Sequence, residues 1–194
     1  MKVLVACEFS GTVRDAFAAQ GHHDVWSCDI LPSQTNGNHI KGDVLDVMNQ
    51  GWDLMIAFPP CTYLCSSGLH WNKRRPERAE KTEEALRFVE ALLRAKIPMI
   101  ALENPIGCIS TRVRKPDQII QPYQFGHCEI KSTCLWLKNL PLLKHTNVIE
   151  KPVNGWDNTT PTGQNNLGPS KDRWAKRSKT YSGVAAAMAS QWNF

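Results

Sequence analysis

Residues 53–65 read Asp-Leu-Met-Ile-Ala-Phe-Pro-Pro-Cys-Thr-Tyr-Leu-Cys, and the interpretation of the whole chain starts from this stretch. The apolar run from Leu54 to Phe58 predicts a short buried strand, which the two prolines end because proline cannot donate to a sheet ladder. Cys61 therefore follows the carboxyl end of a strand, where open α/β sheets bind ligands. A free cysteine is more often a small buried hydrophobe than a nucleophile, so a catalytic role for Cys61 needs a second group.

A second apolar stretch ends in the same way. Residues 97–106 read Ile-Pro-Met-Ile-Ala-Leu-Glu-Asn-Pro-Ile, which places Glu103 and Asn104 directly after a predicted strand over 97–102. Neighbouring strands of a parallel sheet end at the same edge, so we expect the thiol of Cys61 and the carboxyl of Glu103 to face one crevice.

The order of the predicted elements favours an α/β fold. The strongest helix signal covers 79–95, where Leu86, Val89 and Leu93 recur at helical spacing opposite a charged face. Alternating strands and helices build a parallel sheet with helices on both faces, so we predict a Rossmann-like sheet. The other predicted elements are strands at 2–7, 24–28, 40–43, 119–126 and 132–138, and helices at 13–20, 44–49 and 181–192.

Length and composition indicate one soluble domain. We divide the 194 residues into a core over 1–140, an irregular segment over 141–178 and a C-terminal helix over 179–194. No apolar run approaches the roughly 20 residues of a membrane span, and the start of the chain reads as a first strand, not a signal peptide. Seven cysteines favour reduced thiols in a cytoplasm. The net charge of +5 is compatible with a nucleic-acid partner.

Three acidic residues, Glu8, Asp29 and Asp43, follow three early strands. In nucleotide-binding α/β folds an acid after the second strand accepts from ribose hydroxyls. The first turn, Phe9-Ser10-Gly11, is too poor in glycine for a dinucleotide fingerprint, which favours a cofactor without phosphates, held by hydroxyl and adenine contacts. Each acid taken alone is more often a solvated turn residue or a helix cap.

Five motifs carry a resemblance to a known family: Phe9-Ser10-Gly11, Asp29, Gly42-Asp43, Phe58-Pro59-Pro60-Cys61 and Glu103-Asn104-Pro105. In this order and spacing they resemble the S-adenosylmethionine-dependent cytosine-C5 DNA methyltransferases, over about residues 1–140 and again at 182–184. The resemblance implies a class I methyltransferase sheet, S-adenosylmethionine as cofactor and DNA as substrate. The chain is similar to compact phage-encoded members that lack a full target-recognition region.

The resemblance also implies a role for single residues. Cys61 would add to C6 of cytosine and Glu103 would hold N3, while Asn104 would orient Glu103 or the turn. Lys131 would place one positive charge at the carboxyl. Such a site takes the target base out of its stack. The implied cofactor contacts are Phe9, Ser10, Gly11, Asp29, Ile30, Asp43, Val44, Pro59 and Ser182.

Two departures from the family pattern shape the expected substrate. In place of a Gln-x-Arg-x-Arg strand the chain offers only Glu129, Lys131 and Thr133, and a lysine cannot form the bidentate fork of an arginine. Only about 144–177 is available for target recognition. We therefore expect low sequence specificity, a single-stranded or otherwise accessible DNA, or recognition supplied by a partner or a homo-oligomer. The expected nucleic-acid contacts are Ser67, Lys73, Arg74 and Arg75, in a mobile loop after Cys61, and Arg173 and Trp174.

Three alternatives stay open at this point. The chain could be a catalytically weak or inactive relative that only binds nucleic acid, or an enzyme that installs another group at C5 of a pyrimidine by the same thiol chemistry. The third alternative is a zinc site, whose spacing matches no paired ligand pattern well. Its candidate ligands are Cys61, Cys65, His70, Cys128 and Cys134.

Overall fold

A seven-stranded sheet organises the computed structural model, which describes residues 1–21, 24–162 and 164–194. The strand order is β3-β2-β1-β4-β5-β7-β6; β1 to β5 run parallel, and β7 is antiparallel to both β5 and β6. This confirms the predicted Rossmann-like α/β fold. The strands are β1 Val3–Ala6, β2 Val25–Asp29, β3 His39–Lys41, β4 Leu54–Ala57, β5 Met99–Pro105, β6 Gln118–Ile120 and β7 Thr133–Lys138.

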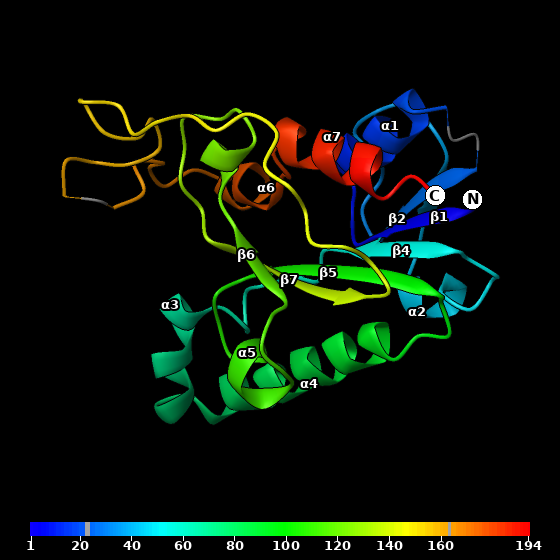
Figure 1. Cartoon of the computed structure of the whole chain (residues 1–194). Coiled ribbons are helices and arrows are strands. Elements are labelled where there is room, and N and C mark those ends of the chain that lie inside the picture. The colour runs from blue at the N-terminus through cyan, green and yellow to red at the C-terminus, as the bar shows by residue number, and fades with distance from the viewer. Residues whose placement is uncertain (22–23, 163) are drawn as a thin grey trace.

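Helices cover both faces of this sheet (Figure 1). α1 and α7 pack together on one face, and α4 and α5 lie on the other. None of the helices in the described ranges is long and apolar enough to cross a membrane. The helices are α1 Thr12–Ala19, α2 Val44–Val47, α3 Ser66–Leu69, α4 Pro76–Leu93, α5 Ile109–Arg112, α6 Arg173–Ser178 and α7 Ser182–Gln191, with 3₁₀ turns η1 His70–Lys73 and η2 Pro122–Gln124.

The core is split by the sheet into two apolar clusters. The central strands β1 and β4 are buried on both faces, which explains why each reads as an unbroken apolar run. Side chains alternate between the clusters: Leu4 packs on the α4 side, whereas Val5 packs on the α1 and α7 side. Trp136 is buried in the cluster on the α4 side, and Trp192 is buried in the cluster on the α1 and α7 side.

Two sequence predictions about local structure were wrong. The strand predicted at 119–126 ends at Ile120, because Pro122 opens the 3₁₀ turn η2 and Gln121 and Gln124 bond reciprocally across it. The mobile loop predicted after Cys61 contains α3 and η1, so its basic run belongs to ordered turns.

Candidate active site

The carboxyl ends of β1 and β2 form the first half of the candidate site. Cys7, directly after β1, has φ of 59°, a left-handed conformation that is uncommon for a residue other than glycine. Burial raises the pKa of its thiol far above the usual range, and the nearby Asp29, Cys28 and Asp43 raise it further. Asp29 and Asp43 therefore lie within electrostatic reach of the same point at this edge. No sequence pattern marked Cys7 as part of it.

Asp29 ends β2 beside a large exposed apolar side chain. Its Oδ1 accepts a hydrogen bond from the backbone N–H of Leu31 at 2.9 Å. Partial burial raises the pKa of the carboxyl, against the lowering effects of the Leu31 N–H, His39 and the Ile30 N–H. Ile30 is 72% exposed, so its side chain is free to cover an apolar ring. This pairing fits a nucleoside, whose ribose hydroxyls donate to a carboxylate.

Asp43 caps α2 and Val44 is the first residue of that helix, but their side chains lie in different environments. The Asp43 carboxylate is exposed and caps α2 by accepting from the N–H of Leu45 at 2.9 Å. Val44 is buried in the core, so its side chain cannot make the cofactor contact expected for it. Only the Val44 backbone is left for that contact.

Glu8, in the turn after β1, caps the start of α1. Glu8 is buried and accepts from the N–H groups of Val13 at 2.6 Å and Arg14 at 3.2 Å, and Ser10 Oγ donates to the same carboxylate at 3.3 Å. A side chain at Gly11, where φ is +75°, would lie 2.1 Å from Thr35 Oγ1, so loop packing requires this glycine. The expected cofactor contacts of Ser10 and Gly11 are therefore limited to backbone.

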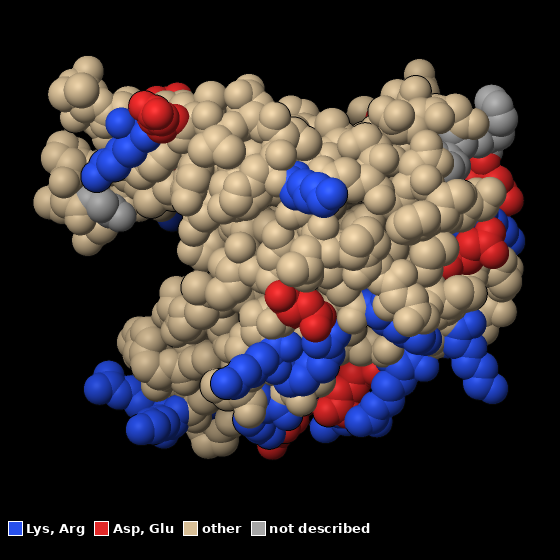
Figure 2. Space-filling model, in the orientation of Figure 1, with Lys and Arg blue, Asp and Glu red and all other residues tan. Residues whose placement is uncertain are grey.

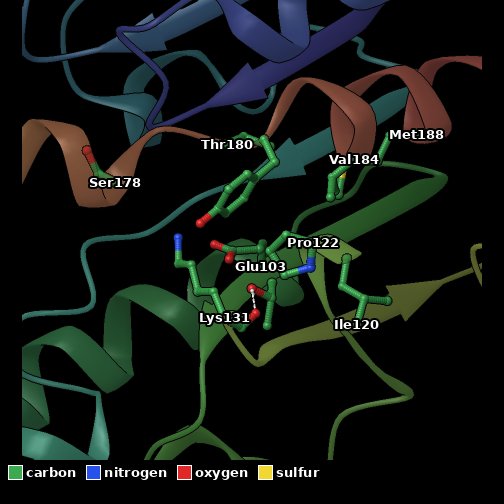
Figure 3. A pocket seen from close by; sticks show the side chains of 10 residues that line it. Glu103, Ile120, Pro122, Lys131, Ser178, Thr180, Val184 and Met188 are labelled. Carbon is green, nitrogen blue, oxygen red and sulfur yellow. Dashed lines mark hydrogen bonds between the residues drawn. The ribbon is translucent and has the colours of Figure 1, made fainter. Parts of the chain in front are cut away.

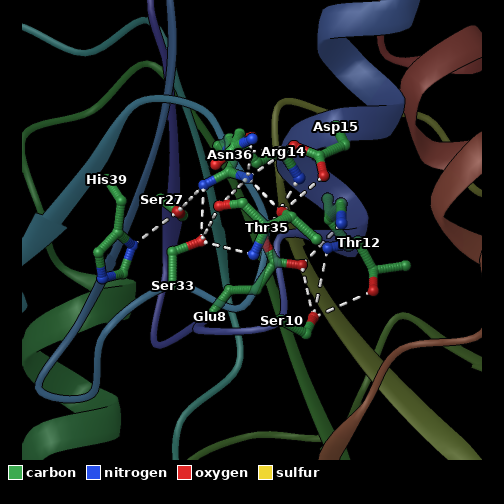
Figure 4. A network of polar contacts seen from close by, with 11 residues as sticks. Glu8, Ser10, Thr12, Arg14, Asp15, Ser27, Ser33, Thr35, Asn36 and His39 are labelled. Carbon is green, nitrogen blue, oxygen red and sulfur yellow. Dashed lines mark hydrogen bonds and ion pairs between the residues drawn. The ribbon is translucent and has the colours of Figure 1, made fainter.

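A buried arginine holds the loop between β2 and β3 against α1 (Figure 4). Arg14 is 1% exposed, and its guanidinium donates to Ser27 Oγ and Ser33 Oγ, both at 3.1 Å. It also donates to Thr35 Oγ1 at 2.5 Å and to the carbonyl of Asn36 at 2.9 Å, and it pairs with Asp15. Arg14 lies at the edge of the buried face of α1 that Val13 and Phe17 form, so helical periodicity alone does not predict its burial.

Arg14→Met is expected to lower the free energy of unfolding by about 3 kcal/mol, because it leaves several buried polar groups without their donor. Urea unfolding followed by circular dichroism measures this change. The matched control is Arg87→Met on α4, where the side chain is exposed and the expected change is below about 0.5 kcal/mol. Equal changes in the two variants would contradict the anchoring role of Arg14.

Glu103 and Lys131 form the second half of the site (Figure 3). They line one pocket with Thr133, Thr180 and Tyr181, and Figure 3 shows the ammonium of Lys131 turned toward the carboxyl of Glu103. Burial raises the pKa of Glu103, while the charge of Lys131 and a hydrogen bond with Thr133 oppose the rise. The pocket has a volume of about 20 Å³, room for about one water molecule, so a base can enter only if the wall moves.

Cys61 is exposed and belongs to the same electrostatic environment. Partial burial of its thiol raises the pKa, as do Cys65 and Glu103, whereas Lys131 lowers it. Cys61 therefore lies within electrostatic reach of Glu103 and Lys131. Among the described residues it does not line the pocket of Glu103, so the expectation that the thiol and the carboxyl face one crevice stays a prediction.

Side chains from β5 and α4 hold the loop that carries Cys61 in place by hydrogen bonds to its backbone carbonyls. The buried Asn104 Nδ2 donates to the carbonyl of Pro59 at 2.7 Å, so Asn104 orients the turn and not Glu103. Asn104 Oδ1 is buried and accepts no hydrogen bond within the described ranges. Arg78 donates to the carbonyls of Thr62 at 2.8 Å and Gly68 at 3.1 Å. The thiol loop is thus held on both sides, and sequence reasoning had missed Arg78.

The expected nucleic-acid residues fall in two different places. Ser67, Lys73, Arg74 and Arg75 are exposed on α3, on η1 and just before α4. Arg173 and Trp174 begin α6, where the Trp174 ring lies 5.6 Å from the ring of Phe9. The structure therefore does not place Trp174 with the basic run but at the first half of the site.

Two predictions remain: the cofactor contact of Ser182, and the alternative zinc site of cysteine and histidine side chains. Ser182 is exposed at the start of α7. Within the described part of the chain, no group of three or more His, Cys, Asp or Glu side chains could hold a metal ion.

Comparisons with known proteins find matches among solved structures. No protein-family model and no curated protein matches the chain. A solved structure with a similar fold, from E. coli, is a candidate DNA modification methyltransferase encoded within a prophage. Its TM-score is 0.45 at 16% identity, and the match covers 79% of this chain and 53% of that one. The chain therefore spans about half the length of this neighbour.

Proposed function

We propose that this protein is an S-adenosylmethionine-dependent methyltransferase that acts on C5 of cytosine in DNA. The observation that carries the proposal is that Cys61 follows β4 and Glu103 lies near the end of β5, two adjacent parallel strands whose ends are joined by the hydrogen bond of 2.7 Å from Asn104 to the Pro59 carbonyl. Lys131 lies within electrostatic reach of both. A thiol next to a carboxyl with a raised pKa is the pair that nucleophilic attack on a pyrimidine ring needs.

The chemistry of the pair follows from cytosine itself. C5 is a poor nucleophile, but addition of the Cys61 thiolate to C6 makes C5 the electron-rich carbon of an enamine. Glu103 in its protonated form donates to N3 and stabilises the charge that the addition moves into the ring. The cofactor supplies an electrophilic methyl group to C5. Loss of the C5 proton to a base then lets the C6–S bond break, which returns the thiolate.

The residues at the first half of the site suit that cofactor. Asp29 offers a carboxylate to the ribose hydroxyls, and Ile30 and Phe9 offer apolar surface to the adenine. Asp43 keeps an exposed carboxylate oxygen for the adenine amine, although one of its oxygens caps α2. No glycine-rich turn is available for phosphates, which agrees with a cofactor that has none.

DNA is the proposed partner because basic and aromatic side chains interleave beside Cys61. The guanidinium groups of Arg74 and Arg75 lie 5.8 and 5.1 Å from the ring of Trp71, and Arg78 lies 4.9 Å from that of Tyr63. Figure 2 shows Lys and Arg gathered over α3 and α4, next to a hollow below the arm of loops that includes residues 150–162 and 164–172. Such a surface binds phosphates and stacks bases.

Arg74→Gln and Arg75→Gln are each expected to reduce the slope of log K against log salt by about 1, because each removes one phosphate contact. Fluorescence anisotropy with a labelled oligonucleotide at several salt concentrations measures the slope. The control is Arg87→Gln, an exposed position on α4 outside this cluster, which should leave the slope unchanged. An unchanged slope in the first two variants would remove the cluster from the DNA site.

The proposed reaction is tested by incubating the protein with DNA and S-adenosylmethionine labelled in its methyl group. Hydrolysis of the DNA and mass spectrometry identify the product, and 5-methylcytosine is expected. A methyl group on an exocyclic amine instead would refute the role of C5. DNA binding without any transfer would support the second candidate function, a nucleic-acid-binding relative without activity, which is favoured by the single lysine and the 20 Å³ pocket.

A further inference from the structure

α6 connects the two halves of the candidate site. At its start, the indole of Trp174 lies 5.6 Å from the ring of Phe9, with the ring planes tilted by 43°. Near its end, the backbone carbonyl of Arg177 accepts a hydrogen bond from Lys131 Nζ at 3.0 Å. Ser178, the last residue of α6, and Thr180 and Tyr181, which follow the helix, line the pocket of Glu103. This short helix from the irregular segment is therefore a wall of the site.

Trp174 keeps a large free surface at this position. It is 57% exposed although one side contacts Phe9, so much of the indole is available to another flat ring. Aromatic rings pair at centroid distances of about 4.5–7 Å, and the 5.6 Å between Phe9 and Trp174 leaves no space for a third ring between them. A ligand ring would lie against the outer surface that the two side chains share.

The neighbours of this surface favour a nucleoside over a nucleic-acid base of the substrate. Phe9 follows β1, whose parallel neighbour β2 ends in Asp29, and Asp43 comes two residues after β3, which pairs with β2. The basic side chains stacked on Trp71 and Tyr63 belong instead to the surface beside Cys61. The strand ends next to Phe9 thus carry carboxylates, which accept from hydroxyls and amines, whereas α6 itself carries the basic residues Arg173, Lys176 and Arg177.

We infer that Trp174 is a cofactor-binding residue and that its indole forms, with Phe9, the wall on which the adenine ring of the cofactor packs. This inference rests on the proposed function, since it assumes an adenosine-containing cofactor. It reassigns Trp174 from the DNA surface to the cofactor half of the site. It also means that the cofactor contacts the helix whose other end holds Lys131.

Isothermal titration with S-adenosylhomocysteine, the demethylated product, tests the inference on the full chain. Trp174→Ala is expected to weaken binding about tenfold or more, the scale of a lost stacking contact, while Trp174→Phe stays within about threefold of wild type. Adenosine should show the same dependence on Trp174. The control is Trp156→Ala, in the same irregular segment but stacked on Tyr123 at 5.0 Å, which should bind like wild type.

The outcomes separate this inference from the proposed function. If wild type binds neither S-adenosylhomocysteine nor adenosine, the proposed function and the inference both fall. If wild type binds and Trp174→Ala binds equally well or more tightly, only the inference falls; tighter binding would mean that the indole occupies the place of the adenine. If Trp174→Ala loses DNA affinity but keeps cofactor affinity, Trp174 belongs to the nucleic-acid surface and not to the cofactor site.

Discussion

Cys61→Ala is expected to abolish methyl transfer, with a fall of about 10⁴-fold or more, because no other group can make C5 of cytosine nucleophilic. Transfer of labelled methyl groups to DNA measures the change. Binding of S-adenosylhomocysteine should be retained, since the residues proposed to hold the cofactor follow β1, β2 and β3 or lie on α6. The matched control is Cys65→Ala, whose thiol contacts Ser67 Oγ at 3.2 Å and which should keep most of the activity.

Trapping the covalent adduct between Cys61 and cytosine tests the same prediction without requiring turnover. DNA with 5-fluorocytosine at the target position cannot lose a proton from C5 after methyl transfer, so the bond between Cys61 Sγ and C6 should persist. Denaturing electrophoresis and peptide mass spectrometry would then find the oligonucleotide on Cys61 in wild type and none in Cys61→Ala. Transfer that survives in Cys61→Ala would refute the covalent mechanism.

Glu103→Gln is expected to lower kcat by about 10²- to 10⁴-fold while cofactor affinity is unchanged. Glutamine fills the same space but cannot pass a proton to N3, so the developing charge on the ring loses its partner. The matched control is Glu84→Gln, an exposed position on α4, which should have wild-type activity. A variant at Glu103 with full activity would mean that the carboxyl does not touch the base.

The same substitution should change how stability depends on pH. Because burial raises the pKa of Glu103, the folded state binds its proton more tightly than the unfolded state does. The stabilising effect of that proton is complete below the ordinary pKa of a glutamate and is lost as pH rises through the raised value. Glu103→Gln should therefore have a higher Tm than wild type at pH 8 and nearly the same Tm at pH 4. A lower Tm at pH 8 would mean that Lys131 more than offsets the burial.

Local sequence was sufficient for most of the fold, and it is the source of the prediction that Cys61 and Glu103 form the central pair of the candidate site. Strands β1 and β4 appear as apolar runs because both of their faces are buried, and α4 shows its buried face as a helical repeat. Proline ends β4 directly before Cys61. Because parallel strands end at one edge of a sheet, the sequence also predicts that Cys61 and Glu103 lie close together.

The remaining features depend on which distant segments meet. Glu8 turned out to be a helix cap, and Asn104 holds the Pro59 turn instead of Glu103. Trp174 lies on Phe9, almost the whole chain away, and this contact redefines the first half of the site. Periodicity and turn residues report only on the local backbone and on burial. The partner of each buried polar group or exposed ring is selected by three-dimensional packing, which therefore decided these contacts.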